Sequence, residues 1–157
     1  MFPEAPMYSA LEALFSKVDK RYLTSDELKA LGRYSLSLPH RLALYRRLRE
    51  AELEIFQAIA DQMEAKLPQE SQENLERSLK GGIGALRQCA MSMLMDEPAL
   101  SADQIRWLRL TQRSYGSESL DSLMFGLLHR QLEQRLNPKQ MTFFERFFQP
   151  FQTLELP

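Results

Sequence analysis

Apolar residues recur at intervals of three and four along most of the chain, which is the spacing of one face of an α-helix. The clearest case predicts a central helix over 71–95, expected to be the longest buried one. Beside its apolar face runs a stripe of small residues: Ser78, Gly82, Ala85, Cys89 and Ser92. Each interior glycine costs a helix about 1 kcal/mol relative to alanine, so Gly81, Gly82 and Gly84 need a compensating contact. A neighbouring helix crossing at short range is favoured over a flat ligand on this face.

The same periodicity predicts helices on both sides of the central one, seven or eight in all. Thr24 and Glu27 form a capping box for a helix from Ser25, and Pro39 is expected to end that helix near Leu38. A second capping box, Ser101 with Gln104, and the pair Asn137 and Pro138 mark the starts of two later helices. The predicted segments are 5–18, 25–38, 40–66, 71–95, 101–114, 117–136 and a Phe-rich helix from 138 that closes the core.

No run alternates like a strand, no long interval repeats and no low-complexity linker divides the chain. The sequence therefore predicts one all-α domain over 1–157, made of an N-terminal helical arm (1–20) and a body (21–157). A net charge of −1 gives no footprint for nucleic acid, and no apolar run approaches the roughly 20 residues that span a bilayer. With no secretion leader at its start, the chain is expected to be cytoplasmic and not membrane-spanning.

The sequence contains few residues arranged for catalysis or for metal or haem binding. No serine stands in a glycine-flanked elbow, and the Lys80–Gly84 segment lacks the residues of a phosphate loop. His129 has only Glu133 at helical pair spacing, which is too few ligands for a metal, and a haem on His129 or His40 is disfavoured. The single cysteine, Cys89, excludes an internal disulfide and is expected to be an inert buried thiol.

Charged residues are dense near the start of the segment 40–66. Arg41, Arg46, Arg47 and Arg49 are followed directly by Glu50, Glu52 and Glu54. Because these charges lie at helical pair spacing, a solvated, salt-bridged helix face is favoured over a site for an acidic partner.

The order of these motifs resembles that of phycobiliproteins, the globin-like antenna subunits of phycobilisomes. The segment 21–68 is similar to their early helices. The matching positions are Arg21, Tyr22, Leu23, Glu27 and Leu28, then Arg41 and Leu42, Arg49 and Glu50, Lys66 to Pro68, Leu86 and Arg87, Tyr115 and Gly116, and the aromatic ending FFERFFQPFQ. The resemblance implies a globin-like, phycobiliprotein-type fold.

The chain departs from this family at the position that carries its pigment. Counting back from Leu86 and Arg87, the chromophore-bearing cysteine corresponds to Ser78, and the bilin-contacting arginine and aspartate correspond to Lys80 and Gly81. A serine cannot form the thioether bond to a bilin. The resemblance therefore implies a bilin-free member, similar to the bilin biosynthesis-associated globins, with no covalent cofactor.

Three functions follow from the resemblance. The leading one is a non-enzymatic interaction or regulatory protein of cyanobacterial bilin or tetrapyrrole metabolism, or of phycobilisome assembly and turnover. The alternative is a noncovalent bilin or haem carrier, with Ser78, Lys80, Arg106 and Arg109 as candidate binding residues. A bilin lyase or isomerase is third.

The amino-terminal arm is the candidate interface. Its helix presents an apolar face on a segment too short to be stable alone, and in phycobiliproteins the corresponding helices dock onto a partner subunit. We expect a homodimer through this face, with folding of the arm onto its own body as the competing interpretation. The face consists of Leu11, Leu14, Phe15 and Val18.

Overall fold

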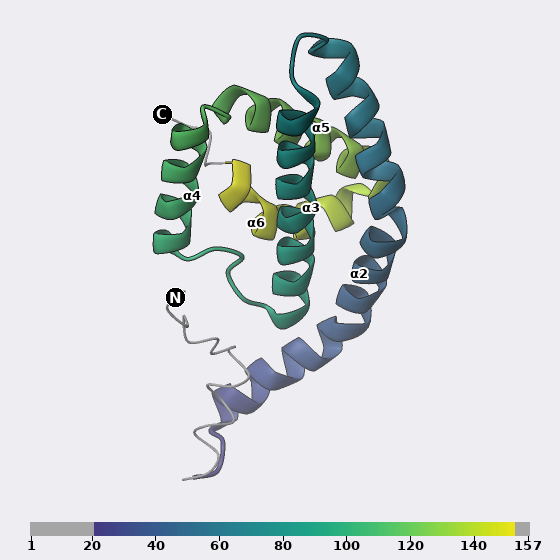
Figure 1. Cartoon of the computed structure of the whole chain (residues 1–157). Coiled ribbons are helices and arrows are strands. Elements are labelled where there is room, and N and C mark those ends of the chain that lie inside the picture. Colours follow the sequence, from purple (N-terminus) through teal and green to yellow (C-terminus); the bar gives the residue numbers. More distant parts are fainter. Residues whose placement is uncertain (1–20, 153–157) are drawn as a thin grey trace.

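A computed structural model describes residues 21–152, and every regular element among them is a helix (Figure 1). The helices are α2 (Ser25–Lys66), α3 (Gln72–Met95), α4 (Ala102–Tyr115), α5 (Glu118–Arg135) and α6 (Pro138–Gln152). The predicted all-helical class is confirmed for this part of the chain, while the globin-like arrangement stays a prediction. The predicted helix over 5–18 lies outside the described residues.

One boundary was predicted wrongly, because the segments 25–38 and 40–66 form a single helix that continues through Pro39. Proline in a helix interior costs roughly 3 kcal/mol. Contacts on both sides of Pro39 offset this cost: the Tyr34 hydroxyl donates to Leu94 O at 2.7 Å, and Arg41 donates to Met93 O. Both carbonyls lie at the end of α3, so α2 does not end at Pro39, and the helix bends where its projecting first part meets the body (Figure 1).

This merger makes α2, with 42 residues, the longest helix of the described chain, in place of α3 with 24. The helix 72–95 is therefore not the longest one, although it carries more buried residues than α2, nine against seven. Its position and bounds are confirmed, because α3 packs against α2, α5 and α6 and begins after the capping residue Ser71. With two predicted helices merged and one outside the described residues, the count in 21–152 is five.

The small-residue stripe of α3 faces the core, and all five of its members are buried. A Cβ atom at Gly82 would overlap Met124 Sδ of α5 and would lie 3.0 Å from Phe56 Cε1 of α2. The predicted close packing is thus confirmed at Gly82. At Gly81 and Gly84, by contrast, no described atom lies within 4 Å of such a Cβ, so packing inside the described chain does not require those two glycines.

The carboxyl-terminal helix closes the core, as predicted. Asn137 Oδ1 accepts the Gln140 backbone N–H at 2.8 Å, and Gln140 Oε1 accepts the Asn137 N–H at 3.1 Å, which is a reciprocal cap. The buried residues of α6 are Met141, Phe144, Phe147, Phe148 and Phe151.

The arginine-rich start of the segment 40–66 is not a uniform solvated face. Arg41 is only 5% exposed. Its Nε donates to Ser37 Oγ at 2.8 Å, its Nη2 lies 3.3 Å from Asp96 Oδ1, and its guanidinium lies over the Phe143 ring. A cation at the carboxyl end of α3 is electrostatically favourable there, because the helix dipole leaves that end partly negative.

The glutamates that follow also pair differently from the prediction. Glu52 binds Arg87 of α3 at 2.6 Å, and Glu54 binds Arg135 of α5 at 2.9 Å. Partners on other helices replace those expected on the same helix, because this stretch of α2 is flanked by α3 and α5.

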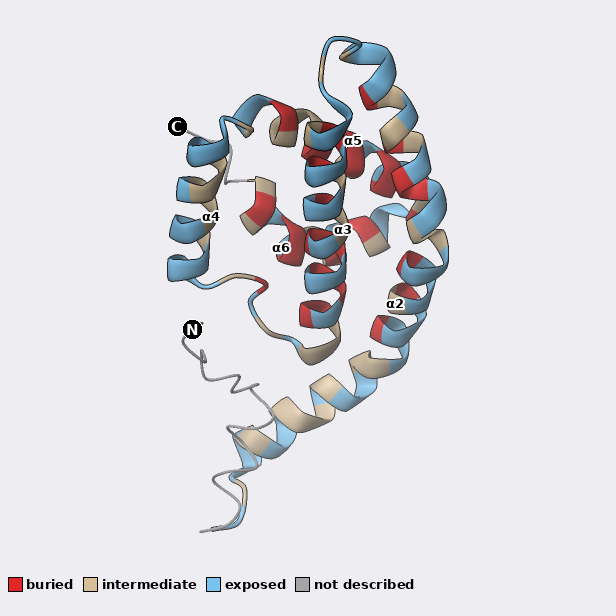
Figure 2. Ribbon diagram, in the orientation of Figure 1, coloured by how far each residue is buried: buried red, intermediate tan, exposed pale blue. Residues whose placement is uncertain are grey.

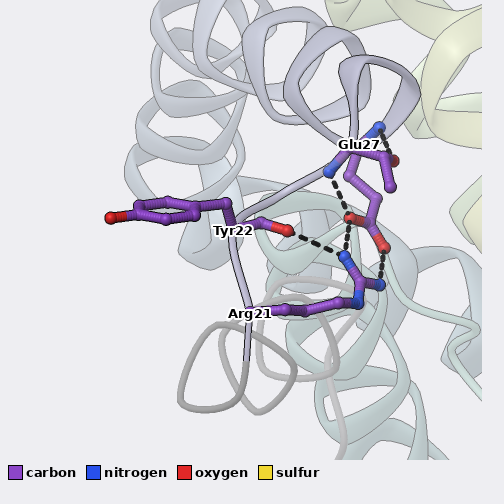
Figure 3. A network of polar contacts seen from close by, with 4 residues as sticks. Arg21, Tyr22 and Glu27 are labelled. Atoms are coloured by element: carbon purple, nitrogen blue, oxygen red, sulfur yellow. Dashed lines mark hydrogen bonds and ion pairs between the residues drawn. The ribbon is translucent and has the colours of Figure 1, made fainter.

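The amino-terminal end of α2 is fixed by a local polar network (Figure 3). Arg21 holds both carboxylate oxygens of Glu27, at 2.8 and 2.9 Å, and the same carboxylate accepts the Thr24 backbone N–H at 2.8 Å. The hydrogen bond from Arg21, and then that from the Thr24 backbone, lowers the pKa of Glu27 to about 2. The predicted capping box is therefore confirmed, and Arg21 extends it.

Candidate functional site

A pocket of about 360 Å³ is formed by α3, α4 and α5 around Ser78. This volume falls at the lower end of the roughly 300–1,000 Å³ typical of small-molecule sites. Apolar side chains of α4, α5 and α6 form part of its wall: Leu108, Leu120, Met124, Phe125 and Phe151. Polar groups of α3, α4 and the first turn of α5 form the rest.

The polar wall converges on Asp121. Its Oδ1 accepts a hydrogen bond from Ser78 Oγ at 2.7 Å, and its Oδ2 accepts bonds from Ser117 Oγ at 2.8 Å and Gln112 Nε2 at 3.4 Å. All three donors are neutral, and no Lys or Arg among the described residues forms an ion pair with this carboxylate. All hydrogen-bond partners of the Asp121 carboxylate in the pocket are therefore uncharged.

Asp121 was missed at the level of the sequence. Ser117 and Asp121 stand four residues apart where α5 begins, which is a local signal of an amino-terminal polar turn. The contact with Ser78 joins residues 43 positions apart, and no sequence spacing predicts it.

The rim of the pocket carries an arginine stacked on a tyrosine. The Arg77 guanidinium carbon lies 4.9 Å from the centroid of the Tyr115 ring, and Arg77 Nη2 lies 3.2 Å from Glu73 Oε1. Gly116, with φ of +60°, occupies the left-handed region that favours glycine, and it ends α4 beside the rim. A positive group is therefore available at the edge, although it is shared with Glu73.

The structure brings only one of the four candidate tetrapyrrole-binding residues to this pocket. Ser78 lies in the wall and is buried, and Gly81 lines the wall as well. Lys80 is exposed and does not line the pocket. Arg106 is exposed with its Nη1 3.8 Å from Asp103 Oδ1, and Arg109 is half-buried; both lie on α4 and outside the wall.

The histidines and the cysteine lie elsewhere. His129 is placed between Glu145, at 3.2 Å, and Glu133, at 3.6 Å. No group of three metal-ligating side chains occurs within 21–152. Cys89 is fully buried, its Sγ–H donates to Phe147 O at 3.3 Å, and burial raises the pKa of its thiol, as expected of an inert cysteine.

The candidate interface residues Leu11, Leu14, Phe15 and Val18 lie outside the described residues. The helix that follows them nevertheless has an unusual surface. Among residues 21–40 none is buried, whereas the remainder of α2 carries seven buried residues (Figure 2). The first part of α2, 25–40, projects from the body, and its exposed leucines are Leu28 (55%) and Leu36 (85%).

No family model matches this chain, and no curated protein matches it. None of the described helices is long and apolar enough to span a membrane.

Proposed function

We propose that the chain is a non-enzymatic, phycobiliprotein-like protein that acts through protein contacts in cyanobacterial bilin or tetrapyrrole metabolism, or in phycobilisome assembly and turnover. The observation that carries this proposal is the projecting first part of α2, residues 25–40. It presents Leu28 and Leu36 to solvent and buries no residue of its own.

The first part of α2 leaves more of its surface exposed than the rest of that helix does. Most helices in proteins are stabilised by packing an apolar face against other elements. The segment 25–40 has no buried residue and contacts the body through Tyr34, which donates to Leu94 O, and His40, which lies against the Phe143 ring. At its start it retains a capping box and the Arg21–Glu27 pair. A helix with a capped start whose leucines stay exposed is suited to bind another protein.

The phycobiliprotein resemblance supplies the class of partner. It rests on the order of motifs from Arg21 onward, and Ser78 at the pigment position favours a member that does not capture light. The proposed partners are phycobilisome subunits or enzymes of the bilin pathway.

Co-sedimentation of the purified protein with purified phycobilisomes tests this function directly. We expect saturable binding that Leu36→Glu weakens at least tenfold. Leu53→Glu is the matched control, because Leu53 is an equally exposed leucine (80%) on the body part of α2. No binding to phycobilisomes or to their separated subunits, or equal losses in both variants, would contradict the proposal.

A second candidate function is noncovalent binding of a bilin or haem, and the pocket beside Ser78 favours it. Asp121 could accept pyrrole N–H groups there, and Phe125 and Phe151 offer apolar surface. Lys80, Arg106 and Arg109 do not line the pocket, so Arg77 is the arginine placed to meet a propionate group.

Absorbance titration with biliverdin or haemin tests the second function. A one-to-one spectral shift is expected, and Gly81→Phe should abolish it, because Gly81 lines the pocket and no described atom lies within 4 Å of its Cβ position. Gly84→Phe is the control, since Gly84 is equally unobstructed but lies outside the pocket wall. An unchanged spectrum with both ligands would rule this function out.

A further inference from the structure

The projecting part of α2 carries a glycine that no contact inside the described chain explains. Gly32 stands in the helix interior, where glycine costs about 1 kcal/mol relative to alanine. Apart from the adjoining residues and the backbone of its own helix turn, no described atom lies within 4 Å of a Cβ built at this position, so an alanine would fit without a clash. Gly82 differs, because Met124 and Phe56 occupy the space that its Cβ would need.

Gly32 lies midway between the two exposed leucines of the segment. Leu28 is four residues before it and Leu36 four residues after it, so the three share one row along the helix surface. With a rise of about 1.5 Å per residue, each leucine lies about 6 Å from Gly32 along the axis. A partner helix that crosses at the glycine can approach the backbone closely and contact both leucines at once.

We infer that a second copy of this chain crosses α2 at Gly32, antiparallel and about a two-fold axis. The inference rests on the proposed protein-binding function and names its first partner. The row of leucine, glycine and leucine reads the same in both directions. A two-fold axis through Gly32 therefore places Leu28 of each copy against Leu36 of the other, which is the self-complementary pattern of an isologous interface.

The neighbouring charges agree with this register. Residues whose numbers sum to 64 face each other in it, so Lys29 lies opposite Ser35 and Asp26 lies opposite Leu38. No like charges are opposed at these positions. Interdigitation of the i±4 rows of both helices corresponds to a crossing angle of about −50°, at which only two to three turns of each helix touch.

The contact is small. One such crossing buries less than the roughly 1,000 Å² of a stable interface, so the dimer dissociates on dilution. We expect sedimentation of the full chain to show a monomer at micromolar and a dimer approaching millimolar concentration. Gly32→Leu and Leu36→Asp should each weaken dimerisation at least tenfold, while Gly84→Leu and Leu53→Asp, on open positions of the body, leave it unchanged.

Cysteine cross-linking tests the register itself. Equal amounts of the Leu28→Cys and Leu36→Cys variants, oxidised together, should form the mixed disulfide at least tenfold faster than either variant pairs with itself. Cys89 does not interfere, because it is buried and its thiol pKa is raised. Mixed and self-pairing at equal rates would overturn the antiparallel register.

Other outcomes separate this inference from the proposed function. A chain that is monomeric at every concentration but still binds phycobilisomes would overturn the inference of a second copy and leave the proposed function intact. A dimer that binds no phycobilisome component would overturn the proposed function and leave the inference of a second copy intact. A monomer that dimerises only after removal of residues 1–20 would show that those residues, and not a second copy, cover the Gly32 row.

Discussion

Replacing Arg41 by methionine should be among the most costly single changes in this protein. Arg41 Nη1 donates to Met93 O, its Nε donates to Ser37 Oγ, and its Nη2 pairs with Asp96. Methionine fills part of the same volume and removes every polar contact. Because Met93 is fully buried, its carbonyl loses a partner at a place with little access to water.

The magnitude follows from these contacts. The hydrogen bond from a charged donor to Met93 O is worth about 1.5–3 kcal/mol, and the bond to Ser37 about 1 kcal/mol. Asp96 is 43% exposed, which limits the ion pair to at most about 1 kcal/mol. The position over Phe143, 4.9 Å from the ring centroid, adds about 0.5–1 kcal/mol. After partial refilling by methionine, we expect a loss of about 3–5 kcal/mol.

Urea unfolding followed by circular dichroism at 222 nm measures this loss. With a slope of about 2 kcal/mol per molar urea, the midpoint should fall by roughly 2 M. Arg41→Lys should lose less, because it keeps the charge but not the planar fork. Arg46→Met is the control, since Arg46 is exposed on the same helix. A loss below about 1 kcal/mol, or one equal to that of the control, would refute this account of the end of α3.

Four further predictions concern individual residues. Gly82→Ala should destabilise the fold by about 1 kcal/mol despite the gain in helix propensity, whereas Gly84→Ala should stabilise it by about 0.5–1 kcal/mol; thermal unfolding of both variants decides, and equal signs would contradict the packing argument. The pKa of Glu27 should measure about 2 by carboxyl NMR and move toward 4.5 in Arg21→Ala. Since folding lowers that pKa, the stability it contributes is complete above pH 4.5 and is lost as the pH falls toward 2. Cys89 should react with a thiol reagent at pH 8 only after unfolding, and a bilin-producing host should attach no covalent pigment; labelling of the native protein, or pigment that survives denaturation, would show otherwise.

Local signals predicted most of the helical boundaries correctly. Ser71, Ser101 and Asn137 each begin a helix where the sequence indicates, because their caps involve only the next three residues. The apolar stripes of α3 and α6 were also found in advance, since burial of one face imposes the helical period.

Pro39 shows where such signals fail. Its local preference is to end a helix, but Tyr34 and Arg41 hold the chain on both sides of it against the end of α3. The same long-range contacts account for the buried Arg41, which the charge pattern placed on a solvated face. The sequence did not predict Asp121 as a pocket residue for the same reason, because its partner Ser78 lies on another helix.

The contacts around Pro39 also connect the proposed interface to the core. The projecting part of α2 joins the body at this bend, and Tyr34 and Arg41 fix its direction against α3. Arg41 lies about 14 Å along the helix from Gly32, at a rise of about 1.5 Å per residue, so it is too far to contact a helix crossing there. Arg41→Lys, which should keep the fold, is nevertheless expected to weaken dimerisation by loosening the bend, and Arg46→Lys is expected to leave it unchanged. Sedimentation at a concentration where about half of the unaltered chain is dimeric distinguishes these two variants. Equal dimerisation of both variants would mean that the segment 25–40 finds its partner without being oriented by the body.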